Sequence, residues 1–434
     1  MNEQPLWHDG RMGPARSIAP LVAPPDAVVR VPGSKSHTNR ALVCAALANG
    51  VSRLDGALLA DDTEAMVDAL RQLGIEIFVD EVEATMQVTG VAGNLPRGSV
   101  RLDVRQSGTT ARFLLPVLAL GTGESVLDGH EQLRRRPFED LVDGLHQLGV
   151  RTSGPVLPIS VAGGTLTGGT ATVPGSVSSQ FLSGLLLSAP CASGAVIVEV
   201  VGDLVSRPYV ELTLSTMRAF GATVDQVDLR RFAVHPTGYV ATDLVIEPDA
   251  SAASYFFGAA AITGGRVRVE GLGRDTVQGD LAFVDVLEQM GAEVDRGDDY
   301  TEVRGVGRLH GVTADLADFS DTAQTLAVVA TFASSPTTLT GIGFIRRKET
   351  DRIAAVVREL RRRGIDAEEH DDGLTVHPGA PSPGRVETYE DHRMAMSFAL
   401  LGLVHPGIEI ADPGCVSKTF PRYFDALEAL RIER

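Results

Sequence analysis

The chain has 434 residues, of which 44% are hydrophobic, and its 39 basic and 56 acidic side chains give a net charge of −17. This length predicts two or three domains with substantial cores, and the acidic balance excludes a general affinity for nucleic acid. Cys44, Cys191 and Cys415 are isolated and follow no CxxC spacing, which excludes a zinc ribbon and a disulfide framework.

Neither end of the chain nor its interior shows a membrane signal. Residues 1–13 are polar and contain no apolar core of a signal peptide. No apolar run approaches the roughly 18 residues that a membrane-spanning helix needs. We therefore expect a cytoplasmic protein with no membrane partner.

Six helices that are apolar on nearly all faces are predicted in chain order, and each opens with hydroxyl or charged residues. They cover residues 36–50, 107–121, 178–194, 251–264, 321–335 and 392–407. A helix that is apolar on all faces has to be buried. These six segments are therefore predicted to form the interior of the protein.

A second, amphipathic helix alternates with the buried one, and five of its copies end at Gly74, Gly149, Gly221, Gly291 and Gly364. A glycine in this position is the usual left-handed cap of a helix. These glycines are 70 to 75 residues apart, and a sixth copy covers residues 425–430. Strands rich in Val, Ile and Thr lie between the helices, so the chain consists of six α/β repeats.

Six repeats of this kind predict an α/β fold with two closed domains of three repeats each. Each domain would be an inside-out barrel with buried parallel helices at its centre and sheets outside. The polar helix openings would then emerge at one end of each domain. Two such ends facing each other would enclose a cleft lined by six positive dipole ends.

The helix openings also hold most of the clustered polar residues, which suits them to bind phosphate or carboxylate groups. The first opening contains Lys35, Ser36 and Arg40 after a Pro-Gly turn. It is not a nucleotide phosphate loop, because Val29 stands where that motif needs its first glycine. No metal-ligand spacing is present, so neither metal nor cofactor is predicted.

Several of these segments resemble motifs of the 5-enolpyruvylshikimate-3-phosphate (EPSP) synthase family, also called 3-phosphoshikimate 1-carboxyvinyltransferases. They occur in the family's order from about residue 28 to the C-terminus. The motifs are Pro32-Gly33-Ser34-Lys35-Ser36 with Asn39-Arg40, Ser107-Gly108-Thr109 with Arg112, Arg135-Arg136-Pro137, Ser178-Ser179-Gln180-Phe181, Lys348-Glu349-Thr350-Asp351-Arg352 and Asp391-His392-Arg393-Met394-Ala395-Met396.

The resemblance implies transfer of an enolpyruvyl group from phosphoenolpyruvate to the 5-hydroxyl of shikimate 3-phosphate, with release of phosphate and without a cofactor. It is a step toward chorismate and the aromatic amino acids. The resemblance also implies a C-terminal domain of residues 1–32 and 247–434 and an N-terminal domain of residues 33–246, with the active site between them. We expect a monomer whose chain crosses between domains near Gly33 and Pro248.

The resemblance further implies a role for individual residues. Asp321, Glu349 and Lys35 would transfer protons. Shikimate 3-phosphate would be held by Lys35, Ser36, Arg40, Ser178, Ser179, Gln180, Ser206, Tyr209, Asp321 and Lys348. Phosphoenolpyruvate would be held by Lys35, Gly108, Arg136, Gln180, Arg352, Arg393 and Lys418, with Thr109 and His392 nearby. The herbicide glyphosate, which occupies the phosphoenolpyruvate site in this family, should inhibit, because tolerant members often have Ala at the position of Gly108.

The sequence departs from the family pattern at two places. Gln106 and Phe113 stand where members often have Asn and Pro. The segment 344–347, Phe-Ile-Arg-Arg, replaces an Asn-Trp-Arg-Val type segment, so an asparagine contact to the ring hydroxyl is lost or replaced.

Two other functions fit the sequence less well. The related family that transfers enolpyruvate to UDP-N-acetylglucosamine typically has Lys-Asn near its start and a reactive Cys in a loop. Here Ser36 follows Lys35, and residues 129–136 contain no Cys. A non-catalytic repeat protein that binds polyanions would have no need for Asp321 or Glu349.

Overall fold

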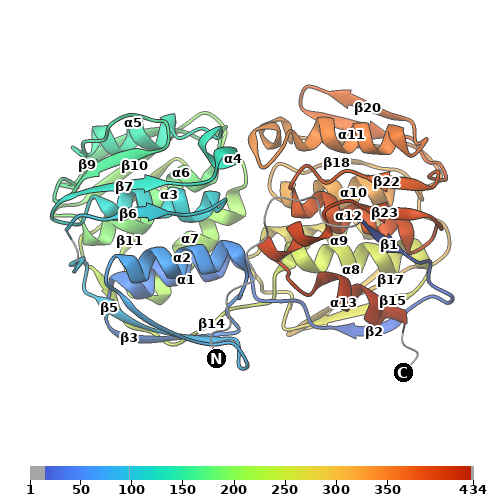
Figure 1. Ribbon diagram of the computed structural model, residues 1–434, viewed down its shortest axis with the longest axis horizontal. Helices are drawn as coiled ribbons and strands as arrows, with labels where there is room; N and C mark the ends of the chain where they lie inside the picture. Colours follow the sequence, from blue (N-terminus) through green and yellow to red (C-terminus); the bar gives the residue numbers. More distant parts are fainter. Residues whose placement is uncertain (1–14, 97, 432–434) are drawn as a thin grey trace.

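The computed structural model describes residues 15–96 and 98–431, which form a mixed α/β fold in two halves lying side by side (Figure 1). The residues for which no signal peptide is expected, 1–13, lie outside this range. In the described part of the chain, no helix is both long and apolar enough to cross a membrane.

The six predicted buried helices are confirmed. They are α1 (Lys35–Leu47), α3 (Gly108–Leu118), α6 (Ser179–Ser188), α8 (Ala250–Thr263), α10 (Ala323–Ala330) and α12 (His392–Gly402). Every residue of α3, α10 and α12 is buried. Each helix ends before its predicted last residue, because strands or turns take over its final positions: β3 begins at Ala48, and Pro190 lies in a 3₁₀ turn after α6.

The amphipathic helices are also confirmed, as α2 (Asp61–Gln72), α5 (Glu139–Gln147), α7 (Arg207–Ala219), α9 (Phe283–Gln289), α11 (Arg352–Arg362) and α13 (Tyr423–Glu428). A short helix, α4 (Glu131–Arg134), precedes α5. The glycines predicted to end the first five copies all have positive φ, between 77° at Gly364 and 107° at Gly291. The left-handed cap therefore closes each of these helices.

The first half contains three open sheets. Their strand orders are β13 (Tyr239–Val240), β3 (Ala48–Asp55), β5 (Thr85–Val91) and β4 (Glu76–Asp80), with β14 (Leu244–Val245) also on β3; β6 (Arg101–Asp103), β7 (Glu124–Asp128) and β8 (Ile159–Ala162); and β11 (Val224–Asp228), β12 (Arg231–Val234), β10 (Val196–Val201) and β9 (Gly169–Pro174).

The second half contains three more. Their orders are β1 (Arg16–Ile18), β23 (Ile408–Ile410) and β22 (Gly384–Val386); β16 (Glu293–Arg296), β17 (Tyr300–Arg304), β15 (Arg266–Glu270) and β2 (Asp26–Val29); and β18 (Thr313–Asp315), β19 (Thr337–Thr340), β21 (Gly373–Val376) and β20 (Ala367–His370). Strands β1 and β2, drawn in blue, thus lie within the half that is otherwise yellow to red (Figure 1).

The parallel strand pairs explain how the chain is shared between the halves. In four repeats the strands before and after a buried helix pair in parallel: β6 with β7, β9 with β10, β18 with β19 and β22 with β23. In the other two the partners are exchanged. Strand β2 precedes α1 but pairs with β15 after α8, whereas β13 and β14 precede α8 but pair with β3 after α1.

The two crossing segments run beside each other between the halves. Gly33 and Pro248 form an isolated antiparallel bridge, flanked by hydrogen bonds from Ser34 N–H to the Glu247 carbonyl and from Asp249 N–H to the Pro32 carbonyl, both 2.8 Å. A Cβ on Gly33 would lie 1.9 Å from the carbonyl oxygen of residue 56, so only glycine fits there. The openings of α1 and α8, which follow directly, are therefore held next to each other.

The buried hydrophobic side chains form two separate clusters that follow this division. One is drawn from residues 41–246, and the other from residues 18–31 and 250–430. Small residues let the buried helices approach closely. On α6, a Cβ added to Gly184 would lie 2.4 Å from the backbone oxygen of Arg112 on α3.

This close approach predicts the effect of Gly184→Ala. Its methyl group would meet backbone, so helix α3 or α6 has to shift, and we expect a loss of about 1–3 kcal/mol in unfolding free energy. The matched control is Gly258→Ala on α8, whose nearest neighbours are side-chain methyl groups at 3.1 Å or more. The control should be neutral or stabilising, because Ala favours helix over Gly. Urea unfolding of both variants measures the difference; equal stabilities would contradict the packing argument.

Candidate functional site

All of the buried helices except α10 carry side-chain caps, and the charge of these caps differs between the two halves. Ser34, Ser107 and Ser178 accept hydrogen bonds from backbone N–H groups at the openings of α1, α3 and α6. The caps of α8 and α12 are the carboxylates of Asp249 and Asp391. A carboxylate offsets the positive end of a helix dipole, whereas a hydroxyl leaves it available. The openings in the first half are therefore the stronger anion sites.

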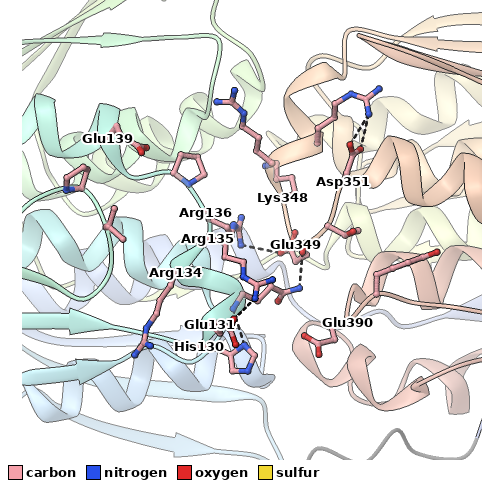
Figure 2. Close-up of a pocket in the computed structure, with 18 residues that line it drawn as sticks. His130, Glu131, Arg134, Arg135, Arg136, Glu139, Lys348, Glu349, Asp351 and Glu390 are labelled. Carbon is pink, nitrogen blue, oxygen red and sulfur yellow. Dashed lines mark hydrogen bonds and ion pairs between the residues drawn. The ribbon is translucent and has the colours of Figure 1, made fainter.

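Side chains from the two halves meet around these openings. The Lys35 backbone N–H donates to Asp249 across the junction at 3.0 Å. Arg136 of the first half lies 3.6 Å from Glu349 of the second (Figure 2), and these side chains are only 8% and 9% exposed. The amide of Gln132 also donates to the Glu349 backbone carbonyl at 2.8 Å. Residues more than 200 positions apart thus form one site.

Arg352, the first residue of α11, is the centre of the charge network. Its guanidinium is 2% exposed and contacts three carboxylates: Asp391 at 2.8 Å, Glu349 at 2.8 Å and Asp321 at 3.2 Å. Asp321, in the 3₁₀ turn Ser320–Thr322 before α10, also contacts Arg393 of α12 at 2.6 Å. The two carboxylates predicted to transfer protons are therefore held by the same arginine.

The cations keep these carboxylates ionised. Burial favours the neutral acid at Asp321, but Arg393, Lys348 and Arg352 outweigh it and hold the pKa well below its usual range. At Glu349 burial acts in the same sense, and Arg352 and Arg136 again lower the pKa well below the ordinary value. Both groups are proton acceptors at neutral pH.

Lys348 differs from the other cations because its own charge is destabilised. Burial lowers its pKa to about 8; the neighbouring Asp321 opposes this shift, while Arg352 and Arg136 add to it. Its ammonium lies 5.9 Å from the centre of the Phe344 ring. Phe344, which stands where the family pattern has an asparagine, thus provides an aromatic face beside this ammonium.

The opening of α3 is tied to that of α6. The Gln180 amide donates to Thr109 at 3.1 Å and accepts from Arg112 at 2.9 Å. A Cβ on Gly108 would lie 2.6 Å from Arg136 Nη1 and 2.8 Å from Arg112 Nη1. A larger residue at 108 would therefore displace two guanidinium groups.

The remaining residues predicted for shikimate 3-phosphate surround the openings of α1, α6 and α7. Ser178 and Ser179 begin α6, and Ser206, at φ 53°, begins α7. Arg40 is 1% exposed and donates to Thr213, Ser183 and the backbone carbonyls of residues 36 and 209. Its guanidinium lies 5.0 Å from the centre of the Phe113 ring. Arg40 thus connects α1 with α6 and α7, and the Phe113 ring packs against its guanidinium.

His392 is fully buried beside this network, and neither ring nitrogen has a hydrogen-bond partner. Burial, Arg393 and Lys35 lower its pKa well below the ordinary value, so the ring is neutral. It is a candidate hydrogen-bonding group for a ligand rather than a fixed cation.

Two cavities adjoin the network. The larger, of about 950 Å³, lies between the halves and is lined by residues that include Arg134, Arg135, Arg136, Arg347, Lys348 and Glu349 (Figure 2). The smaller, of about 10 Å³, is lined by residues that include Lys35, Ser36, Tyr209, Asp280 and Arg393. Some of the predicted site residues thus line a wide opening, and others line a nearly filled interior.

Two carboxylates of the site were missed from the sequence. Asp280 accepts from Tyr209 at 2.7 Å and from Ser251, and Asp62 contacts both Lys35 and Lys418. Asp62 lies in the acidic first turn of α2, where the sequence shows only a common way of stabilising a helix. Among the described residues, no group of three or more His, Cys, Asp and Glu side chains could hold a metal ion.

The protein consists of two halves built from repeated α/β units, and the junction between them is rich in cations and holds ionised carboxylates. These features are those of an enzyme that acts on anionic small molecules. The family model for EPSP synthase (3-phosphoshikimate 1-carboxyvinyltransferase) matches residues 22–427. A 3-phosphoshikimate 1-carboxyvinyltransferase of Trichormus variabilis is 46% identical over 413 residues, covering 94% of this chain and 97% of that protein. One of Nostoc punctiforme is 47% identical over 412 residues, with the same coverage. The chain belongs to the EPSP synthase family.

Solved structures agree with this assignment. The EPSP synthase of Acinetobacter baumannii superposes with a TM-score of 0.81 at 27% identity, covering 95% of this chain and 97% of that one. The enolpyruvyl transferase NikO of Streptomyces tendae has a TM-score of 0.77 at 21% identity, covering 97% and 98%, and shares the fold. The match to the Acinetobacter baumannii enzyme supports the EPSP synthase resemblance over the UDP-N-acetylglucosamine alternative.

The buried carboxyl of Asp280 predicts a pH-dependent effect on stability. Burial and repulsion by Asp321 raise its pKa to about 6. Because this value lies above that of the unfolded chain, the protonated group stabilises the fold below about pH 4, and this stability is lost as the pH rises through about 6. Asp280→Asn should therefore gain about 1–3 kcal/mol relative to the wild type between pH 4.5 and pH 7.5.

Urea unfolding at the two pH values measures this gain. The matched control is Asp275→Asn, which removes an exposed carboxylate from the loop that leads to the 3₁₀ turn of Asp280 (Gly279–Ala282). A pH-independent difference for Asp280→Asn would show that the carboxyl carries no such cost.

Proposed function

We propose that this chain transfers the enolpyruvyl group of phosphoenolpyruvate to the 5-hydroxyl of shikimate 3-phosphate and releases inorganic phosphate, on the route to chorismate and the aromatic amino acids. The observation that carries the proposal is the contact of Arg352 with both Asp321 and Glu349 in a chain of the EPSP synthase family. The two carboxylates supply proton acceptors where two anionic substrates have to meet.

The site has the charge that these substrates need. Two phosphate groups and a carboxylate bring together about five negative charges, which fixed cations and helix openings have to offset. The junction concentrates buried cations in a protein of net charge −17: Lys35, Arg136, Lys348, Arg352, Arg393 and Lys418.

Shikimate 3-phosphate binds at the hydroxyl-capped openings of the first half. Ser178, Ser179 and Gln180 present the opening of α6 to its phosphate, together with Ser36 and Ser206. Tyr209, Lys348 and Asp321 face its ring. Because the Arg40 guanidinium already has protein acceptors, it acts by holding these helix openings in place.

Phosphoenolpyruvate binds between Arg136, Arg352, Arg393 and Lys418, with the backbone of Gly108 at the opening of α3 and Gln180 beside it. Its anionic groups replace part of the negative charge that Glu349 and Asp321 now provide to the arginines. Lys35, Thr109 and His392 complete the surroundings of this substrate.

The reaction needs one proton removed and one delivered in each of its two stages. Asp321 takes the proton of the 5-hydroxyl of shikimate 3-phosphate while the oxygen of that hydroxyl attacks the middle carbon of phosphoenolpyruvate. The Lys35 ammonium, beside the ionised Glu349, donates the proton that converts the methylene into a methyl group. In the second stage Glu349 takes a methyl proton and passes it back to Lys35, and the vinyl bond re-forms. Phosphate leaves with the proton that Asp321 took, assisted by the arginines.

Binding of the substrates also changes the proton affinity of Asp321 and Glu349. The nearby cations hold the pKa values of Asp321 and Glu349 low, which makes these carboxylates weak bases. Phosphate groups that neutralise those cations raise the proton affinity of the carboxylates. The groups therefore become effective bases once both substrates are present.

The proposal includes two domains, residues 33–246 and residues 1–32 with 247–434, each with three buried helices inside three sheets. The separate hydrophobic clusters and the exchanged strands β2, β13 and β14 support this division. We further propose a cytoplasmic monomer that binds no nucleic acid, in keeping with its acidic charge.

Phosphate release tests the function. The purified protein should release phosphate only when shikimate 3-phosphate and phosphoenolpyruvate are both present, with UDP-N-acetylglucosamine as the control acceptor. Mass spectrometry should find the product heavier than shikimate 3-phosphate by one enolpyruvyl group. Release with UDP-N-acetylglucosamine, or no release with either acceptor, would refute the proposal.

Gly108→Ala tests the phosphoenolpyruvate site. The wild type should be inhibited by glyphosate in competition with phosphoenolpyruvate. The added methyl group displaces the ends of Arg136 and Arg112, so the longer inhibitor should lose at least about tenfold in affinity and phosphoenolpyruvate less. Inhibition at several phosphoenolpyruvate concentrations measures both.

Gly258→Ala, in the core of the other half, is the control and should leave both constants unchanged. An equal loss for substrate and inhibitor in Gly108→Ala would argue against this placement of Gly108. A wild type that is not inhibited by millimolar glyphosate would also argue against this placement of Gly108.

A further inference from the structure

One buried carboxylate contacts two of the cations from opposite halves. Asp62, the second residue of α2, is 3% exposed. Its Oδ1 lies 2.9 Å from Nζ of Lys418 in the second half, and its Oδ2 lies 3.4 Å from Nζ of Lys35 in the first. These lysine side chains are themselves only 6% and 12% exposed.

Asp62 is also joined to the opening of α3. Its backbone carbonyl accepts hydrogen bonds from the hydroxyls of Ser107 and Thr110, both at 3.2 Å. Lys418 donates to the neighbouring Gln106 carbonyl at 2.9 Å. The carboxylate is therefore fixed to the same backbone that presents Gly108.

The position of Asp62 makes it a suitable counter-ion. Two buried ammonium groups close together repel each other strongly, and a carboxylate between them removes that cost. The opening of α2 favours a negative side chain as well. Lys418 comes from the other half, so this carboxylate also determines how that half meets the first.

We propose that Asp62 is a positioning residue that holds Lys35 and Lys418 in the geometry required by phosphoenolpyruvate. Without it the two ammonium groups would move apart, and Lys418 would withdraw from the first half. The inference rests on the proposed function, because it concerns the placement of two groups assigned to that substrate. It predicts that the loss of Asp62 affects phosphoenolpyruvate far more than shikimate 3-phosphate.

The test compares Asp62→Asn, Lys418→Met and the double variant in steady-state assays with each substrate varied. Asp62→Asn should lower kcat/KM for phosphoenolpyruvate by about tenfold or more, since small misplacements of binding groups have large effects on rate. Its KM for shikimate 3-phosphate should stay within about twofold of the wild type. The double variant should lose much less than the product of the two single losses, because both remove one interaction.

Asp61→Asn is the matched control, since this neighbouring carboxylate is exposed and bonds only Ser417 among the contacts that the structure gives its side chain. It should have wild-type kinetics. Equal effects of Asp62→Asn on both substrates, or losses that multiply in the double variant, would overturn the inference. A wild type without turnover would instead refute the proposed function, and the inference with it.

Asp62→Glu covers the case in which Asp62→Asn does not fold. It keeps the charge but moves the carboxylate by one methylene. A loss confined to phosphoenolpyruvate would support the positioning role, and unchanged kinetics with both substrates would overturn it.

Discussion

The site depends on the contacts of Arg352. One buried guanidinium contacts Asp321, Glu349 and Asp391, which come from three segments of the second half. Removal of one partner from such a buried group typically costs about 3–5 kcal/mol, because the remaining charges stay desolvated. The same contacts fix the two proton acceptors relative to each other. The stability of the second half and the positions of its two proton acceptors therefore both depend on Arg352.

The junction between the halves is stabilised by opposite charges in close contact. Six positive helix ends that face each other would repel if they had no counter-ions. The structure places carboxylates beside cations of the opposite half, as in Arg136 with Glu349, Lys418 with Asp62, and Arg207 with Asp318. Anionic substrates therefore compete with these carboxylates for the cations, and that competition links binding to the acid–base state of the site.

The sequence predicts the repeats, the helix types and most of the residues that meet at the junction. It succeeds because a fully apolar helix can only be buried, and because glycine at Gly74 or Gly364 marks a helix end. The sequence does not predict that Asp62 and Asp280 belong to the site, because the residues that these carboxylates contact lie far away in the chain. The hydrogen bonds of Arg40 to residues of α6 and α7 are likewise tertiary contacts that the sequence does not show.

The central claim is that the helix openings of both halves form a single site for two anions. A crystal structure with shikimate 3-phosphate and glyphosate tests it most directly. The account predicts the phosphate of shikimate 3-phosphate at the opening of α6 near Ser178 and Ser179, and the inhibitor in contact with Arg136, Arg352 and Lys418. Ligands bound within one half alone, or on the exposed arginines of α11 such as Arg361, would contradict it.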